Sequence, residues 1–458
     1  MSEEDEDDGG ITFKEMNELA NSTVDWLKVI NAKFENIHNF TEKDKIYSDR
    51  HYVKKVSEFL GKYEIRHISN FIIYKIIFNL APYAGPEIED LYETFMKTKV
   101  SRDMYKHSKR WEHCATWIQN VYRFSITRLF VKEYIDPQGR EKTNEMIELI
   151  RESYKKTIED SSWVDHETKG RALLKANSMV KHVSYPDFIF DDMALENYYK
   201  YIPTVKGTHF SNVVDAKLNK SLKIMKELKD PYNPNEWSFN PLKINAFYMA
   251  ISNSIWFPVG VLQLPFFDET RPAAVNYAMV GSLIGHEMGH GFDNKGRSFD
   301  EKGYRKNWWT PKTLENFVDK AKCFVNQYDD YCPEELQGEN ITKTCVDGSR
   351  TLGENLADFT GITAAFQGYK HWVKEHGEEK RLPGLENFSS EQIFFISYAY
   401  MWCENLPPAN WVGRYGNDEH SPANYRVMGT LSNVKEFADS FKCPPGKMNN
   451  GEKRCKLW

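Results

Sequence analysis

Apolar and polar positions follow a helical period from residue 11 to about residue 235. The amphipathic stretches Glu58–Asn79 and Trp111–Tyr134 and the charged run Thr143–Thr157 all show it, because side chains three or four positions apart share one helix face. A polar cap before Thr168–Val180 predicts a further helix. Strand-forming runs and glycines are scarce here, so this part is predicted to be almost entirely helical.

The pattern changes near residue 236. Asn245–Gln263 combines β-branched and aromatic residues with a central Ser-Asn-Ser, which predicts a β-hairpin. Ala273–Phe292 is then apolar on nearly all sides, which is typical of a buried helix. The predicted fold class is therefore mainly α with a small β-sheet.

Apart from the phenol of Tyr277, the ionisable side chains of this apolar helix are His286, Glu287 and His290. Burying them is costly unless a partner offsets the cost, and a metal ion is a common partner. The two histidines lie four apart, so both imidazoles can reach one ion. Glu287 lies about 100° round the helix, beside the metal. This HExxH pattern predicts a zinc site where Glu287 is the general base that takes a proton from metal-bound water.

Zinc needs a third protein ligand and one open position for water. The metzincin pattern would place glycine and histidine where this chain has Asp293 and Gly296, which excludes that pattern. The gluzincin pattern takes a glutamate from a later helix, and the segment Gly353–Asp358 (GENLAD) supplies Glu354. Glu354 and Asp358 share a face, so one can bind metal while the other holds the second nitrogen of a ligand histidine. The predicted ligands of one zinc ion are His286, His290 and Glu354.

Composition and charge narrow the function further. A chain of 458 residues is long enough for two units. Its net charge of -6 gives no electrostatic footprint for nucleic acid. The acidic start Met1–Asp8 is predicted to be a disordered tail and lacks the basic region of a signal peptide. No run reaches the roughly 18 to 20 apolar residues of a membrane span, so no transmembrane segment is expected within this chain.

Cysteines give the clearest indication of the compartment. The chain has seven, and none has a Cys-x-x-Cys spacing. An odd, dispersed set indicates oxidised pairs together with partners outside this chain, which argues against the cytosol. Sequons for N-glycosylation add little weight, because a chain of this length carries a few by chance. They lie at Asn21, Asn39, Asn219, Asn340 and Asn387.

The residues in and around these motifs resemble the neprilysin family of zinc metallopeptidases, which includes the endothelin-converting enzymes. The resemblance runs from about Ile11 to Trp458. Its strongest matches are the segments Asn245–Tyr248, Phe257–Gly260, Gly285–Asp293, Trp308–Trp309, Gly353–Asp358, His420–Arg426 and Cys455–Trp458. The resemblance implies a thermolysin-like (gluzincin) catalytic lobe and a partial helical lid lobe.

The resemblance also implies roles for single residues. Asn245 and Ala246 correspond to edge-strand contacts with the substrate backbone. His420 corresponds to the donor that stabilises the carbonyl oxygen as it becomes negative, and Arg426 to a clamp on the substrate carbonyl beyond the scissile bond. Asp358 corresponds to the partner of the first ligand histidine.

An uncharged pocket is implied as well. Phe266, Leu283 and Trp402 correspond to the wall of the pocket for the residue after the cleaved bond.

The implied activity is zinc-dependent hydrolysis of oligopeptides on the amino side of bulky hydrophobic residues. Peptides are the expected partners, and the cell surface or the extracellular space is the expected location, where a family member is a glycoprotein with disulfide bonds.

Domain boundaries follow from the same resemblance. We expect an acidic disordered tail (1–10), a linker or helical segment (11–49), a partial helical lid domain (50–206) and the zinc peptidase domain (207–458). Family members usually have a long segment before the point that matches Ile11, with a signal anchor and half of the lid. The chain thus resembles an N-terminally short member, and the apolar stretch Phe71–Tyr83 is expected to be exposed and prone to aggregation.

The resemblance implies that Cys323 pairs with Cys455. Cys332 and Cys345 are candidates for an additional local bridge. Three cysteines are left without partners in this chain: Cys114, Cys403 and Cys443.

Two alternatives to an active peptidase of this family remain. The first is a neprilysin-like protein that binds zinc but is weak or inactive because its lid is incomplete. The second is an enzyme outside the family that shares only the zinc site. Turnover of a quenched peptide with and without a chelator separates the first alternative from an active enzyme.

Overall fold

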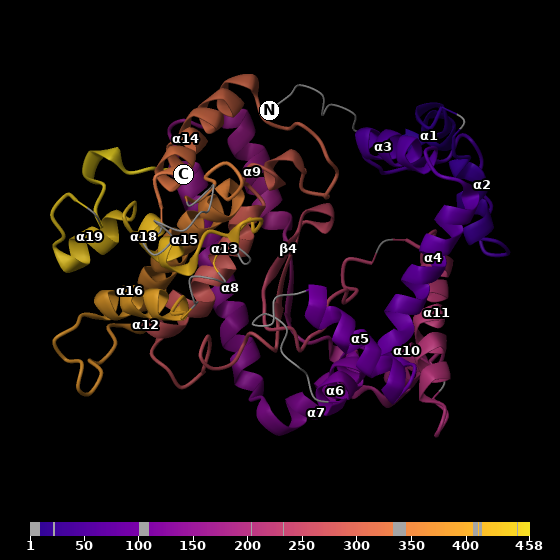
Figure 1. Ribbon diagram of the computed structural model, residues 1–458. Coiled ribbons are helices and arrows are strands. Elements are labelled where there is room, and N and C mark those ends of the chain that lie inside the picture. The colour runs from indigo at the N-terminus through magenta and orange to yellow at the C-terminus, as the bar shows by residue number, and fades with distance from the viewer. Residues whose placement is uncertain are drawn as a thin grey trace. The chain divides into compact units, whose positions relative to one another are not determined.

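The computed structural model describes residues 10–21, 23–99, 110–202, 204–231, 233–332, 345–405, 411, 415–446 and 448–458. The expected acidic tail, up to residue 9, and the sequon at Asn340 lie outside these residues. The fold is mainly α-helical with small sheets, which confirms the predicted class (Figure 1). Tertiary contacts divide the chain into two compact units: Met1–Tyr122 with Phe190–Asn233, and Arg123–Ile189 with Pro234–Trp458. The expected boundary near residue 206 does not coincide with this division, because residues 123–189 pack with the second unit.

The first unit consists of helices and one two-stranded antiparallel sheet. Its elements are β1 (Ile11–Thr12), α1 (Phe13–Leu19), α2 (Trp26–Lys33), β2 (Lys45–Ile46), α3 (Arg50–Leu60), α4 (Ile65–Leu80), η1 (Ala81–Tyr83), α5 (Pro86–Lys99), α6 (Arg110–Val121), α10 (Asp192–Tyr199) and α11 (His209–Glu227). Thr12 and Glu15 form a capping box that starts α1. A small core gathers there around Ile11, Phe13 and Val53.

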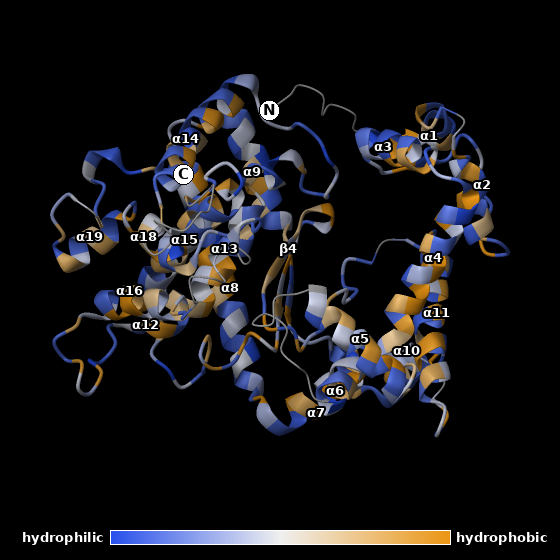
Figure 2. Ribbon diagram, viewed as in Figure 1, coloured by the Kyte–Doolittle hydropathy of each residue, from blue (hydrophilic) through white to orange (hydrophobic). Residues whose placement is uncertain are grey.

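Helix α4 carries an apolar sequence without a buried face. None of its 16 residues is buried, and Figure 2 shows how apolar the helix is. The exposed fractions of Phe71 and Ile77 are both 61%. The expected exposure of Phe71–Tyr83 is confirmed for most of that stretch, although Ala81 is buried. The predicted amphipathic stretch Glu58–Asn79 is not one helix, because α3 ends at Leu60 and α4 begins at Ile65.

The second unit contains the larger core and a three-stranded sheet. Its elements are α7 (Arg123–Tyr134), α8 (Pro137–Asp160), α9 (His166–Ser178), β3 (Val180–Ser184), η2 (Asp187–Phe190, which ends at the unit boundary), β4 (Phe247–Met249), η3 (Ala250–Ser252), β5 (Ser254–Pro258), α12 (Ala273–Asn276), η4 (Tyr277–Gly281), α13 (Ser282–His290), η5 (Gly296–Ser298), α14 (Pro311–Asp329), α15 (Leu352–His376), α16 (Ser390–Met401), α18 (Ala423–Leu431), α19 (Lys435–Phe441) and η7 (Gly451–Lys453). Helix α9 is the one predicted over Thr168–Val180, and Asp165 caps it by accepting the N–H of Thr168.

The predicted hairpin over Asn245–Gln263 is confirmed as β4 and β5, which pair antiparallel. The third strand, β3, pairs parallel with β5 and was not predicted. The sheet order is β3-β5-β4, so β4 is an edge strand. The predicted apolar helix Ala273–Phe292 forms as α12, a π-helical turn (η4) and α13 in direct succession.

Close packing of α13 against α15 positions the residues of interest. A Cβ atom on Gly285 would lie 2.6 Å from the carbonyl oxygen of Gly361, and one on Gly361 would lie 2.7 Å from the backbone nitrogen of His286. Glycine at both positions therefore lets the two helix backbones approach closely. This contact brings the HExxH segment against the GENLAD segment.

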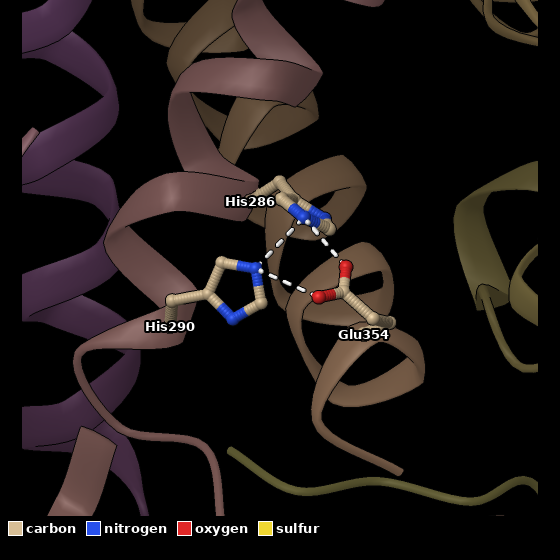
Figure 3. A group of neighbouring side chains, drawn as sticks. All are labelled: His286, His290 and Glu354. Carbon is tan, nitrogen blue, oxygen red and sulfur yellow. Dashed lines mark hydrogen bonds and ion pairs between the residues drawn. The ribbon is translucent and has the colours of Figure 1, made fainter. Parts of the chain in front are cut away.

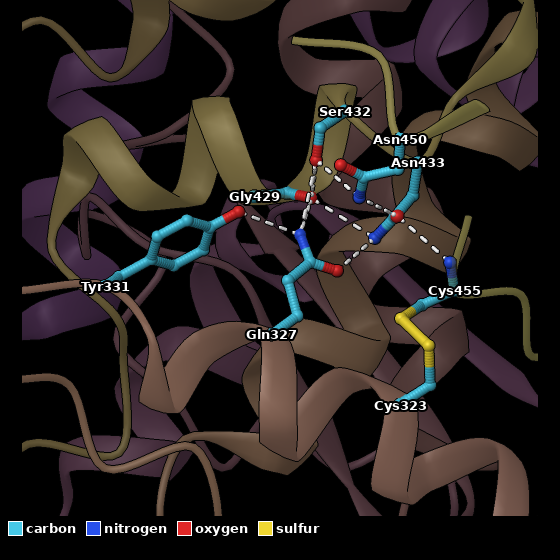
Figure 4. Close-up of a disulfide and its surroundings, with 8 residues drawn as sticks. All are labelled: Cys323, Gln327, Tyr331, Gly429, Ser432, Asn433, Asn450 and Cys455. Carbon is cyan, nitrogen blue, oxygen red and sulfur yellow. Dashed lines mark hydrogen bonds between the residues drawn. A yellow bond between two sulfur atoms is a disulfide. The ribbon is translucent and has the colours of Figure 1, made fainter. Parts of the chain in front are cut away.

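Two disulfides tie the second unit together. Cys323 of α14 is bonded to Cys455, which confirms the pairing implied by resemblance, and the local bridge Cys332–Cys345 also forms. Figure 4 shows the polar network beside the first bond. In it the backbone N–H of Cys455 donates to Asn433, whose side chain donates to Gln327. The remaining three cysteines carry free thiols.

Among the helices that the structure describes, none is both long and apolar enough to cross a membrane.

Candidate metal centre

His286 and His290 point their Nε2 atoms at each other from successive turns of α13, at 3.0 Å (Figure 3). Glu354 in the first turn of α15 faces both rings. Its Oε2 lies 3.2 Å from Nε2 of His286 and its Oε1 lies 3.6 Å from Nε2 of His290. The structure thus brings together the three predicted ligands, with one donor atom from each within 4.8 Å of the others.

The opposite nitrogens of the two rings are held by carboxylates. Nδ1 of His286 lies 2.8 Å from Oδ1 of Asp358, and Nδ1 of His290 lies 2.7 Å from Oδ2 of Asp293. Each Nδ1–H therefore donates to a carboxylate, which leaves a lone pair on each Nε2. Asp358 holds the nitrogen that sequence analysis assigned to it.

These contacts test whether the residues fit zinc. Two facing Nε2 lone pairs at 3.0 Å repel unless a cation lies between them. Oε2 of Glu354 is buried, and no hydrogen bond from the described residues satisfies it. Two neutral imidazoles and one carboxylate are a donor set that zinc prefers, with a fourth position left for water. The residues present fit the metal.

The surroundings of the two glutamates shift their pKa values in opposite directions. Glu287 is buried on α13, and burial raises the pKa of its carboxyl group. Burial also acts to raise the pKa of Glu354, but the two imidazoles outweigh it and hold that pKa well below its usual range. Glu354 is therefore an anion suited to bind metal, whereas Glu287 is suited to accept and return a proton.

Arg426 of α18 is buried against the far side of Asp358. Its Nε and Nη2 donate to the two carboxylate oxygens at 2.7 and 2.6 Å. Burial acts to raise the pKa of Asp358, but the guanidinium prevails and lowers it to about 2. Asp358 thus stays ionised between the guanidinium and the imidazole of His286. The guanidinium also stacks on Trp402, with 3.9 Å from Cζ to the ring centre.

His420 approaches the cluster from the loop before α18. Its Nε2 lies 3.2 Å from Oε2 of Glu354, and its Nδ1 lies 2.8 Å from Oδ1 of Asp418. Asp418 also accepts the backbone N–H of His420. The side chain is 47% exposed, so its ring can meet a bound molecule.

With this geometry in view, two sequence profiles described as "Peptidase family M13" match the chain, over residues 2–186 and 245–457. The chain belongs to peptidase family M13. This confirms the resemblance to the neprilysin family, and membership implies zinc as the metal.

The curated relatives of the chain include neprilysins and an endothelin-converting enzyme. Neprilysin-11 of Caenorhabditis elegans is 34% identical over 95% of this chain and 51% of its own length. Human neprilysin is 32% identical over 96% and 58%, and mouse endothelin-converting enzyme 1 is 31% identical over 98% and 57%. The chain thus spans about half the length of the curated relatives it matches.

Solved structures show the same fold. Mycobacterium tuberculosis zinc metalloprotease ZMP1 in complex with an inhibitor has a TM-score of 0.85 at 24% identity, covering 99% of this chain and 67% of that one. A Haemonchus galactose-containing glycoprotein complex has a TM-score of 0.71 at 26% identity, covering 97% and 71%.

The expected substrate-binding residues lie on several elements of the second unit. Asn245 is exposed and Ala246 is buried, immediately before the edge strand β4. The three expected pocket residues are half-buried at the border of the main apolar core. They are Phe266, Leu283 and Trp402.

Sequence analysis missed two carboxylates of the site. Asp293 was named in the metzincin comparison and at the end of the matching segment Gly285–Asp293, but it was given no role, although its spacing of three from His290 is a signal for contact. Asp418 has a comparable signal, since it lies two residues before His420. Both contacts depend on loop conformations that the residue pattern does not specify.

Proposed function

We propose that this chain is a zinc-dependent endopeptidase that hydrolyses oligopeptides on the amino side of bulky hydrophobic residues. The observation that carries the proposal is the pair of Nε2 atoms facing Glu354, with Glu287 buried on the same helix. In this proposal the second unit is the catalytic lobe, and the first unit contributes to a helical lid.

Each residue near the metal centre has a distinct task. His286, His290 and Glu354 hold one zinc ion, which supplies Lewis-acid chemistry when bound there. Glu287 takes a proton from the attacking water and returns it to the leaving amine; its raised pKa makes it a stronger base for the first transfer. With both ring nitrogens protonated and Nδ1–H donating to Asp418, His420 donates from Nε2 to the carbonyl oxygen as negative charge develops. Asp358 fixes the ring of the first histidine.

Substrate binding uses the sheet edge and the half-buried aromatic residues. The outer edge of β4, with Asn245 and Ala246 before it, can pair with an extended peptide as an added strand. Arg426 takes the substrate carbonyl beyond the scissile bond. Phe266, Leu283 and Trp402 form the uncharged pocket, which favours bulky apolar residues. One methylene changes binding by only about 1 to 3 kcal/mol, so the preference is broad.

The proposed location is outside the cell or on its surface. Two disulfides are present in the described residues, and such bonds persist in oxidising compartments. Peptides in the same compartment are the proposed substrates.

Peptide turnover tests this proposal. The 458-residue chain is incubated with a quenched peptide that has one Leu-Phe bond, and the products are identified by mass spectrometry. Cleavage before Phe, loss of activity with a chelator and recovery with zinc are expected. A matched peptide with Asp in place of Phe is the control. Zinc binding without any turnover would favour the binding-protein alternative, and cuts mainly before Asp, Lys or Gly would contradict the pocket assignment.

A further inference from the structure

Lys175 of α9 is a buried cation that the proposed reaction does not use. The exposed fraction of this residue is only 1%. Its Nζ donates to three backbone carbonyl oxygens, those of Gly291 at 2.6 Å, Gly296 at 2.7 Å and Phe299 at 2.6 Å. An ammonium group has three N–H donors, so all three are used within one segment of backbone.

This segment, residues 291–299, leaves α13 directly after His290. It carries Asp293, whose Oδ2 accepts from Nδ1 of His290 and whose Oδ1 accepts the backbone N–H groups of Lys295 and Gly296. A Cβ atom on Gly296 would lie 1.7 Å from the carbonyl oxygen of His290. The segment is thus folded tightly over the end of the helix.

The charge on Lys175 matches these surroundings. Burial lowers the pKa of its amine to about 7, and the nearby Asp293 carboxylate opposes that shift. A neutral amine has two N–H donors and would leave one of the three carbonyls without a partner. Nζ also lies 5.4 Å from the ring centre of Phe292 and 5.8 Å from that of Trp308, where the rings favour a cation.

The side chain of Asn253 links the backbone of Lys175 to the three-stranded sheet. Asn253, in the turn between β4 and β5, donates from Nδ2 to the carbonyl oxygen of Lys175 at 3.0 Å and to that of Glu301 at 3.3 Å. Lys175 therefore stands where α9, the hairpin and the segment after His290 converge.

We propose that Lys175 is a positioning residue of the metal centre, which holds segment 291–299 so that Asp293 fixes the ring of His290. This rests on the zinc site of the proposed function. The ammonium does not touch the metal ligands themselves; it acts through three carbonyls and one carboxylate. Loss of a carboxylate that holds a ligand histidine, as Asp293 holds His290, changes metal affinity by roughly 10- to 100-fold.

The test compares zinc affinity with folding in matched variants of the 458-residue chain. Lys175→Met removes the charge and the donors but keeps a chain of similar length. Asp165→Ala is the control, because Asp165 also anchors α9, through Thr168, Thr310 and Thr313, without touching segment 291–299. Zinc dissociation constants come from competition with a chromophoric chelator, and the folded fraction from circular dichroism. We expect about 10-fold weaker zinc binding in Lys175→Met and less than about 3-fold in the control.

Three further variants are Lys175→Gln, Asp293→Asn and a double variant at both positions. Lys175→Gln retains N–H donors and is used if the Met variant does not fold; its zinc binding should weaken in the same direction. Combining Lys175→Met, or Lys175→Gln in that case, with Asp293→Asn should weaken zinc binding by less than the product of the single effects, because both act through one segment. Unchanged zinc affinity in a folded Lys175 variant, or an equal loss in Asp165→Ala, would overturn this inference alone. A parent chain that binds no zinc would overturn the proposed function with it.

Discussion

In the second unit, α8, α13 and α15 share one continuous apolar core, whereas α4 in the first unit buries none of its residues. The described core of the first unit around β1 and α1 is small. Both units are rich in amphipathic helices by sequence. Among the described residues, the second unit packs them around many buried aromatic side chains such as Trp256 and Phe394, whereas the first unit has the buried ring of Phe13. All predicted metal ligands lie in that unit.

A metal site needs surroundings that hold its donor atoms in place. Donor atoms must be held within a few tenths of an ångström, and side chains in a close-packed interior have few alternative positions. The glycine contact between α13 and α15 supplies that precision for His286 and Glu354. A helix such as α4, with an exposed apolar face, offers no comparable constraint.

Removal of the general base in the second unit should have the largest effect. Glu287→Gln should lower the rate of peptide hydrolysis by about 10²- to 10⁴-fold, because proton transfer is lost. Zinc content and amide exchange in both units should stay as in the parent chain. Rates come from the quenched peptide and zinc content from elemental analysis. Substantial residual activity with full zinc occupancy would rule out Glu287 as the base.

Removal of the metal should speed amide exchange in the second unit but not in the first. Zinc at about 1,000 times its dissociation constant stabilises the folded state that binds it by about 4 kcal/mol. A chelator should therefore speed amide exchange in α13 and α15 and leave that in α1 and α3 unchanged. Hydrogen exchange followed by mass spectrometry measures both regions in one sample. Equal acceleration of amide exchange in the two units would contradict a metal site held by the second unit.

A single methyl group should disturb the helix contact. Gly285→Ala places a Cβ atom 2.6 Å from a backbone oxygen of α15, so the helices must separate, at a cost of about 1 to 3 kcal/mol. Denaturant unfolding followed by tryptophan fluorescence measures the loss, and zinc affinity should fall with it. Gly170→Ala in α9 is the control, because nothing lies within 4 Å of its added Cβ. A similar loss in both variants would refute the role of close helix approach.

The smallest change in the free energy of unfolding is expected for a substitution in α4. Ile77 is 61% exposed, and Ile77→Gln should change the free energy of unfolding by less than about 0.5 kcal/mol. Ile362→Val in α15 removes one methylene from a fully buried side chain and should cost about 0.5 to 1.5 kcal/mol. Denaturant titration compares the two variants. A larger loss for Ile77→Gln would show that α4 has a buried partner in solution.

Much of the fold and the site could be predicted from sequence because the signals are local. The HExxH spacing places two histidines on one helix face, and the Ser-Asn-Ser turn marks the hairpin between β4 and β5. The ligand Glu354 needed only the rule that zinc takes a third ligand from a later helix. The residues named for metal binding do lie together.

What could not be predicted depends on tertiary packing. The short strand β3 pairs with β5, which lies some seventy residues further along the chain, and nothing in its own five residues specifies that partner. Helix α8 was expected in the lid but packs with α15 in the second unit. The partnership of Asp293 with His290 likewise depends on how the next segment folds back. Periodicity shows which face is apolar, and packing decides what covers it.

The disulfide between Cys323 and Cys455 makes a covalent ring of the chain, with a sequence separation of 132. Glu354, Asp358, His420 and Arg426 all belong to this ring, whereas His286 and His290 lie on the open chain before it. A single break of the backbone anywhere between the two cysteines therefore converts one chain into two without releasing either. After a break between Cys323 and Glu354, the metal ligands would belong to two polypeptides that separate on a gel only after reduction.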